Sequence, residues 1–192
     1  MSPRARPRLV LASRSPRRAE LLRSAGYRFT VRASSVVEQA RAGEAPAALA
    51  RRLAMEKAMD VARRLREGQA LGADTLVVVG GEILGKPADD AEARRMLRRL
   101  SGREHRVVTG VALCSAGGLL LDSAIASTIV AFNKLSAAEI AWYVATGDPA
   151  DKAGAYGIQG GAALFVRGIR GSYSNVVGLP LEIVHSMLGL PP

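Results

Sequence analysis

The run Ser13-Arg14-Ser15-Pro16-Arg17-Arg18 concentrates hydroxyl and guanidinium groups at one point of the chain. It follows the apolar stretch Leu9-Val10-Leu11-Ala12, which predicts a buried strand, and it precedes a segment of helical character. Pro16 suits the first helical position, where free backbone N–H groups and the helix dipole attract anions. Guanidinium groups bind phosphate oxygens in a planar fork. This local pattern fits a phosphate site and, equally, a capped surface helix with incidental arginines.

Two carboxylates are candidates for binding a metal or orienting a water molecule. Gly72-Ala73-Asp74-Thr75 is expected to open an apolar strand, where a buried carboxylate needs a partner or a chemical task. A turn aspartate that bonds its own backbone is the alternative for Asp74. Glu38 follows a short apolar run, although an isolated glutamate is usually a solvated surface residue.

The remaining polar candidates lie among the lysines and in one glycine-rich segment. Only four of the 27 basic residues are lysine. Lys57 and Lys86 therefore suggest sites that need a compact ammonium, although chance retention explains them almost as well. Glycines punctuate residues 151–160 and permit close approach of a ligand to the backbone. In this segment Gln159 could pair with the edge of a base through its amide; a plain glycine-rich loop is the alternative.

Several kinds of chemistry are disfavoured by what the sequence lacks. His105, His185 and the single Cys114 form no metal-ligand spacing, and we expect both histidines to be structural. Neither Ser13 nor Ser15 has a neighbouring base in the sequence, which argues against a covalent intermediate. One cysteine excludes a disulfide within the chain and favours a reducing compartment, and no apolar stretch reaches the length of a membrane span. We therefore expect a cytoplasmic protein without a membrane partner.

Periodicity and turn residues indicate the elements that must position these candidates. Apolar residues at helical spacing predict a helix over 46–67, and Gly80-Gly81 predicts a hairpin between strands at 76–79 and 82–84. The other predicted elements are a helix around 19–22 that stops at Gly26, a strand at 27–33, a helix from Asp89 or Asp90 to 100, strands at 107–113 and 119–132, a helix from the capping box at 136–139 through 144, a last hairpin from 163–166, 168–171 and 173–177, and a closing helix at 181–188. Because helices and hairpins intermix, we expect an α/β fold with a mixed sheet, two lobes and a central cleft. On this interpretation residues 1–192 form one domain, with residues 1–8 as a flexible tail.

The formal net charge of +10 raises the question of a nucleic-acid partner. Aromatic residues make up only 4% of the chain, fewer than stacking on single-stranded bases usually requires. The pairs Arg51-Arg52, Arg63-Arg64 and Arg94-Arg95 fall at helical spacing, which favours a solvated helix face over a nucleic-acid groove. A basic protein would still attract a polyanionic substrate such as a triphosphate.

Taken in order, these segments resemble the Maf family of nucleoside triphosphate pyrophosphatases, and the likeness covers nearly the whole chain. The blocks that carry it are "LVLASRSPRR" (9–18), "LAMEKA" (53–58), "GADTLVVVGGEILGKP" (72–87), "MLRRLSGREHRVVTGVAL" (96–113), "YVATGDPADKAGAYGIQG" (143–160) and "GSYSNVVGLPLE" (171–182). Each block alone is a weak signal, whereas their combination and order are specific.

The resemblance implies a two-lobed α/β fold like that of the inosine triphosphatase group. It also implies hydrolysis between the α and β phosphates of a nucleoside triphosphate with a divalent metal, Mg²⁺ or Mn²⁺. The form "GAYGIQG" is similar to the dTTP/UTP pyrophosphatase branch. By the same resemblance Asp74 is the catalytic residue, and Arg17, Thr75 and Gln159 set the choice of base.

The expected site can be stated residue by residue. Glu38 and Asp74 would hold the metal, because hard cations prefer carboxylate and phosphate oxygen. The expected substrate-binding residues are Ser13, Arg17, Arg18, Lys57, Thr75, Lys86 and Gln159. This sequence departs from the family where Val37 replaces one member of an acidic pair beside Glu38, which could weaken metal binding. It also has Arg14 where a small residue is common.

Two other functions are compatible with the sequence. The same chemistry could act on another nucleotide, such as CTP, 7-methyl-GTP or a modified pyrimidine. Alternatively, the basic chain could be a non-enzymatic, nucleic-acid-binding regulator of septum formation, which predicts salt-sensitive binding to DNA. The oligomeric state is open, and a homodimer is compatible with the sequence.

Overall fold

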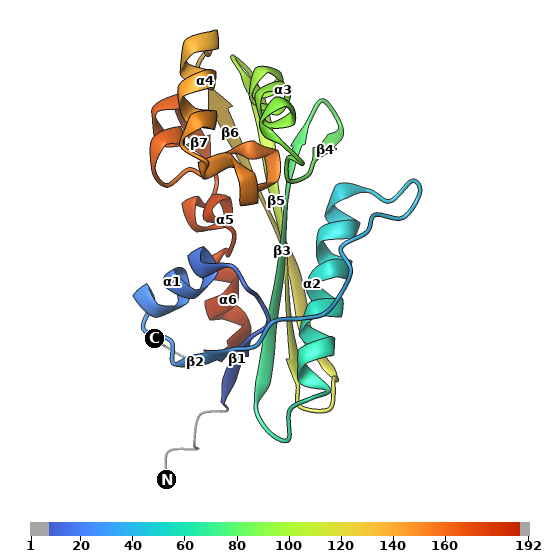
Figure 1. The fold of residues 1–192 in the computed structure, drawn as a ribbon. Coiled ribbons are helices and arrows are strands. Elements are labelled where there is room, and N and C mark those ends of the chain that lie inside the picture. The colour runs from blue at the N-terminus through green and yellow to red at the C-terminus, as the bar shows by residue number, and fades with distance from the viewer. Residues whose placement is uncertain (1–7, 189–192) are drawn as a thin grey trace. The chain divides into compact units, whose positions relative to one another are not determined.

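The computed structural model describes residues 8–188, so that only Arg8 of the predicted flexible tail lies within the described residues. Its strands and helices, drawn in Figure 1, are β1 (Leu9–Leu11), α1 (Pro16–Ser24), β2 (Phe29–Val31), α2 (Pro46–Ala62), β3 (Gln69–Val79), β4 (Glu82–Leu84), α3 (Asp90–Leu100), β5 (Glu104–Ser115), β6 (Leu120–Phe132), α4 (Ala137–Ala145), the 3₁₀ turns η1 (Asp148–Asp151), η2 (Ala153–Ala155) and η3 (Gly161–Phe165), β7 (Val166–Arg170), α5 (Tyr173–Val177) and α6 (Leu181–Leu188). Among these elements no helix is long and apolar enough to cross a membrane.

The strands form one mixed sheet, which confirms the predicted α/β class. Its order is β2-β1-β3-β5-β6-β7, with β4 paired to β3 outside this path. Strand β1 runs parallel to both β2 and β3, whereas β4 and β7 are antiparallel to β3 and β6. Parallel pairs need crossover connections, and the long segments that contain α1 and α2 supply them.

The chain divides into two compact units. The first comprises Met1–Asp74, Gly110–Ile125 and Gly178–Pro192, and the second comprises Thr75–Thr109 and Ala126–Val177. Strands β3, β5 and β6 contribute residues to both units. The single domain with a central cleft stays a prediction.

In the first unit, alternate residues of each strand pack against different helices. The residues that pack with α1 and α6 are Leu9, Leu11, Leu71, Ala73, Val111 and Leu113. Their neighbours in sequence, which pack with α2, are Val10, Ala12, Ala70, Ala112 and Cys114. Successive side chains of a strand point to opposite faces of the sheet. Helix α2 therefore covers one face of this unit, and α1 and α6 cover the other.

Two glycines bring α2 into backbone contact with the sheet. A Cβ atom at Gly72 of β3 would overlap the carbonyl oxygen of Ala54, and one at Gly110 of β5 would overlap that of Ala50. Ala50 and Ala54 lie one helical turn apart, so the same face of α2 rests on both strands. This close contact fixes the position of every side chain on that face of the helix.

The second unit has its own core. Helix α3 buries Ala93, Met96, Leu97 and Leu100, which is the spacing of one helix face. These residues belong to a cluster with strand residues such as Val107 and with the aromatic side chains Phe132, Tyr143, Tyr156 and Phe165. The predicted caps at Asp89 and at Ser136–Glu139 are confirmed, since both side chains accept the expected backbone N–H.

The structure corrects several predicted boundaries. Strand β3 begins at Gln69 rather than Leu76, because small residues that pack against α2 hid its pattern. Strand β2 is shorter than 27–33, and α2 ends at Ala62, five residues before the predicted end. The polar run after Ala62 carries no helix-stopping residue until Gly68, which explains the overextension.

The predicted last hairpin is wrong. Residues 161–165 form η3, which buries Ala162 and Phe165 three positions apart, as a 3₁₀ turn does. Strand β7 pairs with the distant β6, and residues 173–177 form the helix α5. The pairing partner of β7 is set by contacts that no local pattern encodes.

Candidate functional site

The loop between β1 and α1 presents a buried serine beside the start of a helix. Ser13 Oγ accepts hydrogen bonds from the backbone N–H of Ser15 and from Nη1 of Arg18, both at 3.2 Å. Ser15 is the N-cap, and Pro16 occupies the start of α1, as predicted. The first turn of α1 has no acidic residue. Because Ser13 accepts in both bonds, its own hydroxyl proton is the one it can donate to an anion.

Arg18 fixes this loop to two other parts of the first unit. Its Nη1 donates to the carbonyl oxygen of Ala73 at 2.9 Å, and its Nε donates to that of Gly178 at 2.7 Å. Burial lowers the pKa of Arg18, and the carboxylates of Asp74 and Glu38 oppose that shift. A guanidinium remains charged in proteins, so Arg18 holds the loop and also adds positive charge beside Ser13.

Lys57 joins the two predicted carboxylates. Its Nζ lies 2.6 Å from Oδ1 of Asp74 and 2.7 Å from Oε1 of Glu38. Asp74 and Lys57 are only 4% and 7% exposed, whereas about half of the Glu38 side chain is exposed. The sequence named all three residues, and the structure places them in contact through one ammonium group.

The fold explains why Lys57 meets Asp74. Asp74 lies two positions beyond Gly72 in β3, and therefore projects from the same face toward α2. Lys57 follows Ala54 by three residues and sits on the helix face that rests on Gly72. Asp74 thus lies inside β3. The prediction that it stands at the start of a strand and the alternative that it lies in a turn are both wrong.

One oxygen of the Asp74 carboxylate has no hydrogen-bond partner within residues 8–188. Its Oδ2 atom is buried and accepts no hydrogen bond from any part of the chain that the structure describes. A buried carboxylate oxygen without a donor is costly, and such groups mark a ligand, an ion or a catalytic role. Asp74 Oδ2 and the half-exposed Glu38 fit a hard cation such as Mg²⁺, which binds one or two carboxylates together with substrate phosphates. Within residues 8–188, three or more His, Cys, Asp and Glu side chains do not gather at a metal site.

Arg17 is the second residue of α1 and is half-buried in the first unit, whereas Thr75, Lys86 and Gln159 belong to the second unit. Thr75 pairs through its hydroxyl with Thr109 at 3.0 Å. Lys86 is exposed in the loop after β4, and Gln159 is exposed in the turn after η2. The backbone N–H of Gly154 donates to the carbonyl oxygen of Gly85 at 2.9 Å, so the loop that carries Lys86 is bonded to η2, the element before the turn with Gln159.

Comparison with known proteins identifies the relatives of this chain. The sequence pattern of the family described as Maf-like protein matches residues 8–190. This chain belongs to the Maf family. The predicted resemblance is thereby confirmed over nearly the full length.

Curated Maf relatives cover almost the same length as this chain. The protein of Symbiobacterium thermophilum named dTTP/UTP pyrophosphatase is 55% identical over 94% of this chain and 92% of its own. The protein of the same name from Geobacter sulfurreducens is 55% identical over 94% and 95%, and that of Myxococcus xanthus 52% over 95% and 93%. Among solved structures, a nucleoside-triphosphatase (dITP/XTP pyrophosphatase) from Mycobacterium abscessus matches 68% of this chain and 76% of its own, with 17% identity and a TM-score of 0.39, a partial likeness.

The Maf chain also buries polar residues to which the sequence assigned no role. Asn175 in α5 is fully buried and donates through Nδ2 to the carbonyl oxygen of Val107 at 3.0 Å and to Thr128 Oγ1 at 2.9 Å. Its Oδ1 atom is buried without a hydrogen-bond partner among the described residues. The polar run Ser172-Tyr173-Ser174-Asn175 was a visible signal. The sequence predicts a strand for residues 173–177, whereas they form α5, which places Asn175 in the interior of the second unit.

The two histidines of the Maf chain pair with tyrosines. Nε2 of His105 lies 2.7 Å from the hydroxyl of the buried Tyr156, and Nδ1 of His185 lies 3.0 Å from that of Tyr27. These contacts agree with the expected structural role of both residues. Cys114 is a free, buried thiol, and burial raises its pKa.

Proposed function

We propose that this Maf-family protein hydrolyses dTTP and UTP between the α and β phosphates, releasing the nucleoside monophosphate and pyrophosphate. The relatives that share more than half of its residues over nearly its whole length carry the name dTTP/UTP pyrophosphatase. The observation in the structure that best supports the chemistry is the buried Oδ2 of Asp74, which lies beside Lys57 and has no hydrogen-bond partner among the described residues.

Asp74 is the proposed catalytic residue. Its Oδ1 is engaged by the Lys57 ammonium, which fixes the carboxylate and leaves Oδ2 available for a water molecule or a cation. A water that attacks phosphorus must lose a proton, and Oδ2 is a fixed acceptor for it. The water oxygen bonds to the α-phosphorus, the bond between this phosphorus and the oxygen that bridges to the β-phosphate breaks, and that oxygen leaves with pyrophosphate.

The cations of the first unit would stabilise the phosphates. Ser13 would donate its hydroxyl proton to a phosphate oxygen, and Arg17 and Arg18 would supply positive charge at the start of α1. Lys57 would neutralise the charge of non-bridging phosphate oxygens in addition to that of the Asp74 carboxylate. Phosphoryl transfer depends mainly on positioning and charge stabilisation, which this arrangement can provide.

A divalent metal fits the carboxylates of this unit. Asp74 and Glu38 would hold Mg²⁺ or Mn²⁺, which when bound supplies Lewis-acid polarisation of the phosphoryl group. Because no third His, Cys, Asp or Glu side chain completes a metal site within residues 8–188, we expect the metal to bind firmly only together with the triphosphate.

The remaining assignments rest on the family. We retain Thr75, Lys86 and Gln159 as substrate-binding residues, with Arg17, Thr75 and Gln159 selecting the pyrimidine. A cytoplasmic location and the absence of a nucleic-acid partner also stay predictions. A homodimer is compatible with the sequence.

The test is release of pyrophosphate from a panel of nucleoside triphosphates, with Mg²⁺ or Mn²⁺ and after chelation. Asp74→Asn should lower kcat by about 10²- to 10⁴-fold, the usual contribution of a positioned acid or base, while substrate binding persists. Asp122→Asn, which removes an exposed carboxylate from β6, is the matched control and should remain active. Turnover retained in Asp74→Asn would contradict the catalytic role.

The same panel separates the alternatives. Release from CTP or 7-methyl-GTP in preference to dTTP and UTP would keep the mechanism and discard the assignment of base choice. If no nucleotide is hydrolysed with either metal, a salt-sensitive DNA-binding assay would test the nucleic-acid-binding regulator.

A further inference from the structure

The segment that carries Glu38 has no regular structure. Residues 32–45 connect β2 to α2 without a helix or a strand, and Figure 1 shows this connection running beside α2. Backbone hydrogen bonds of a sheet or helix therefore do not fix Glu38. Side chains of α2 supply the fixation instead.

The Arg52 side chain binds the segment that directly follows Glu38. Its Nε and Nη2 donate to the two carboxylate oxygens of Glu44 at 2.7 and 2.6 Å, a bidentate pair. The same Nη2 donates to the backbone carbonyl oxygen of Gln39 at 2.9 Å. The side chains of Arg52 and Glu44 are only 17% and 12% exposed. Their hydrogen bond is the largest cause that lowers the pKa of Glu44, to about 2.

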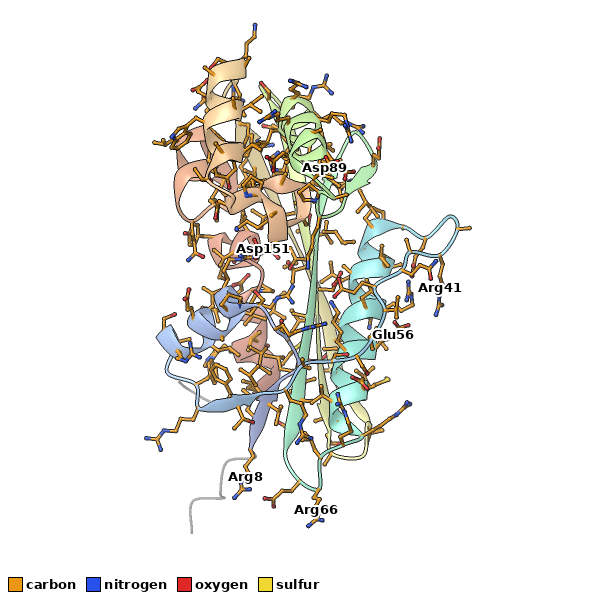
Figure 2. All side chains as sticks on the ribbon, in the orientation of Figure 1. Arg8, Arg41, Glu56, Arg66, Asp89 and Asp151 are labelled. Atoms are coloured by element: carbon orange, nitrogen blue, oxygen red, sulfur yellow. The ribbon has the colours of Figure 1, made fainter. Side chains whose placement is uncertain are left out.

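Glu56, one turn later in α2, also binds the Arg52 guanidinium. Arg52 Nη1 donates to both of its carboxylate oxygens, at 3.1 and 3.2 Å. Arg41 in the connection lies 3.6 Å from the same carboxylate, and Figure 2 labels both Arg41 and Glu56. The Arg52 guanidinium is thus held on two sides, which limits the freedom of the residues it binds.

The earlier part of the connection is held by a second pair. Asp60 Oδ2 accepts the backbone N–H of Ser35 at 2.9 Å, and Arg64 Nη2 donates to the carbonyl oxygen of Ala33 at 3.2 Å. Arg52, Glu56 and Asp60 follow one another at helical spacing and form a charged stripe along α2, and Arg64 lies just beyond the end of this helix. The prediction of a solvated face is therefore wrong for Arg52, and Arg64 also binds the connection.

We infer that Arg52 is a positioning residue, which holds Glu38 against Lys57 by binding the chain directly after it. The inference rests on the proposed function, because it gives Glu38 a part in metal binding. Glu38 lies between two anchored points, Ser35 and Gln39, and its Oε1 reaches Lys57 at 2.7 Å. Loss of the Arg52 fork would release one of those points and let the carboxylate move away from the site.

A double-mutant cycle tests this coupling, with dTTP as substrate and Mg²⁺ as metal. Arg52→Lys keeps the charge and removes the bidentate fork. It should lower kcat/KM by about tenfold, within the range measured for coupled contacts, with most of the loss in kcat. In an enzyme that already carries Glu38→Gln, Arg52→Lys should have no additional effect. Arg51→Lys, on the exposed neighbour in the same helix, should leave the activity unchanged.

The cycle has clear contrary outcomes. If Arg52→Lys lowers kcat/KM equally with and without Glu38→Gln, Arg52 does not act through Glu38. Unchanged activity in Arg52→Lys would overturn the inference as well, and so would a loss confined to KM.

A second readout does not depend on turnover. Amide hydrogen exchange over residues 36–44 should become faster in Arg52→Lys and stay unchanged in Arg51→Lys. If the wild-type protein hydrolyses neither dTTP nor UTP, the proposed substrate is wrong and exchange alone decides whether Arg52 positions Glu38. Unaltered exchange in Arg52→Lys would then reject the inference.

Discussion

Lys57 is the positive charge at the centre of the candidate site, because its ammonium group pairs with two carboxylates. Its contact with Asp74 is almost wholly buried, whereas its contact with Glu38 reaches the surface. A buried ion pair adds little net stability, but removal of one partner leaves an uncompensated charge. Lys57 therefore ties the stability of the first unit to the geometry that we propose for catalysis.

Lys57→Met should leave the Asp74 carboxylate buried and unpaired. We expect the free energy of unfolding to fall by about 3 kcal/mol, as measured when one partner of a buried pair is removed. Denaturant titration would check this value, with Lys134→Met as the control for loss of an exposed lysine.

Adding Asp74→Asn to Lys57→Met removes the stranded charge, so part of the lost stability should return. Because both residues belong to the proposed site, pyrophosphatase activity should be strongly reduced in both variants. A double variant no more stable than Lys57→Met would argue that lost packing, rather than the unpaired carboxylate, causes the destabilisation.

At the scale of elements, helix α2 performs three tasks. The face that rests on the sheet at Gly72 and Gly110 also presents Lys57 to Asp74, and a second face binds the connection of residues 32–45. These tasks share one rigid helix, so a shift of α2 would disturb the ion pair and the position of Glu38 together.

Gly72→Ala should displace α2 from the sheet. The added Cβ would overlap backbone atoms of Ala54 and Ala58, which cannot rotate away. Overpacking of this kind costs about 1–3 kcal/mol. We expect a loss of stability in that range, together with a loss of pyrophosphatase activity. Gly168→Ala, where an added Cβ meets nothing within 4 Å, is the control and should alter neither property. Normal activity in Gly72→Ala would show that the site tolerates movement of the helix.

At the scale of the whole molecule, 27 basic and 17 acidic residues give the net charge of +10, and several of the acidic residues form local ion pairs with arginines. Ion pairs form between Arg8 and Glu67, Arg64 and Asp60, Arg99 and Glu82, and Arg170 and Glu104. Exposed pairs contribute about 0–1 kcal/mol each, so they say more about solubility than about stability. The response of stability to pH should instead come from buried titratable groups.

His105 is the group from which we expect the clearest pH effect near neutrality. It is 3% exposed, packs edge-on against Phe132, and has a buried Nδ1 without a hydrogen-bond partner among the described residues. Burial lowers its pKa from 6.5 to about 4. The unfolded chain therefore binds a proton more readily than the folded protein does between these two values.

The contribution of the neutral His105 to the free energy of unfolding should accordingly be fully present above pH 6.5 and be lost as the pH drops toward 4. A shift of this size corresponds to a loss of about 3 kcal/mol from His105. Unfolding free energies measured between pH 4 and 7 would reveal the slope. His105→Gln should make the slope shallower, whereas His185→Gln, which alters an exposed histidine, should not. Equal slopes in His105→Gln and the wild type would assign the effect to other groups.

The amino-acid sequence is sufficient to predict the class of the fold, most helices and the three residues at the centre of the candidate site. Cap residues and turn glycines act locally, which is why α3, α4 and the β3–β4 hairpin were predicted closely. The family was also determined by sequence, since the order of its motifs is specific. The sequence predicts Ser13, Glu38, Lys57 and Asp74 as site residues without specifying any contact between them.

Only the tertiary structure decided how these residues meet. Lys57 touches Asp74 because two glycines let α2 rest on the sheet, and such close packing depends on residues far apart in the chain. The start of β3, the partner of β7 and the role of Arg52 were likewise settled by distant contacts. Local propensity cannot specify these features, because the free energy that selects them comes from burial and pairing between elements.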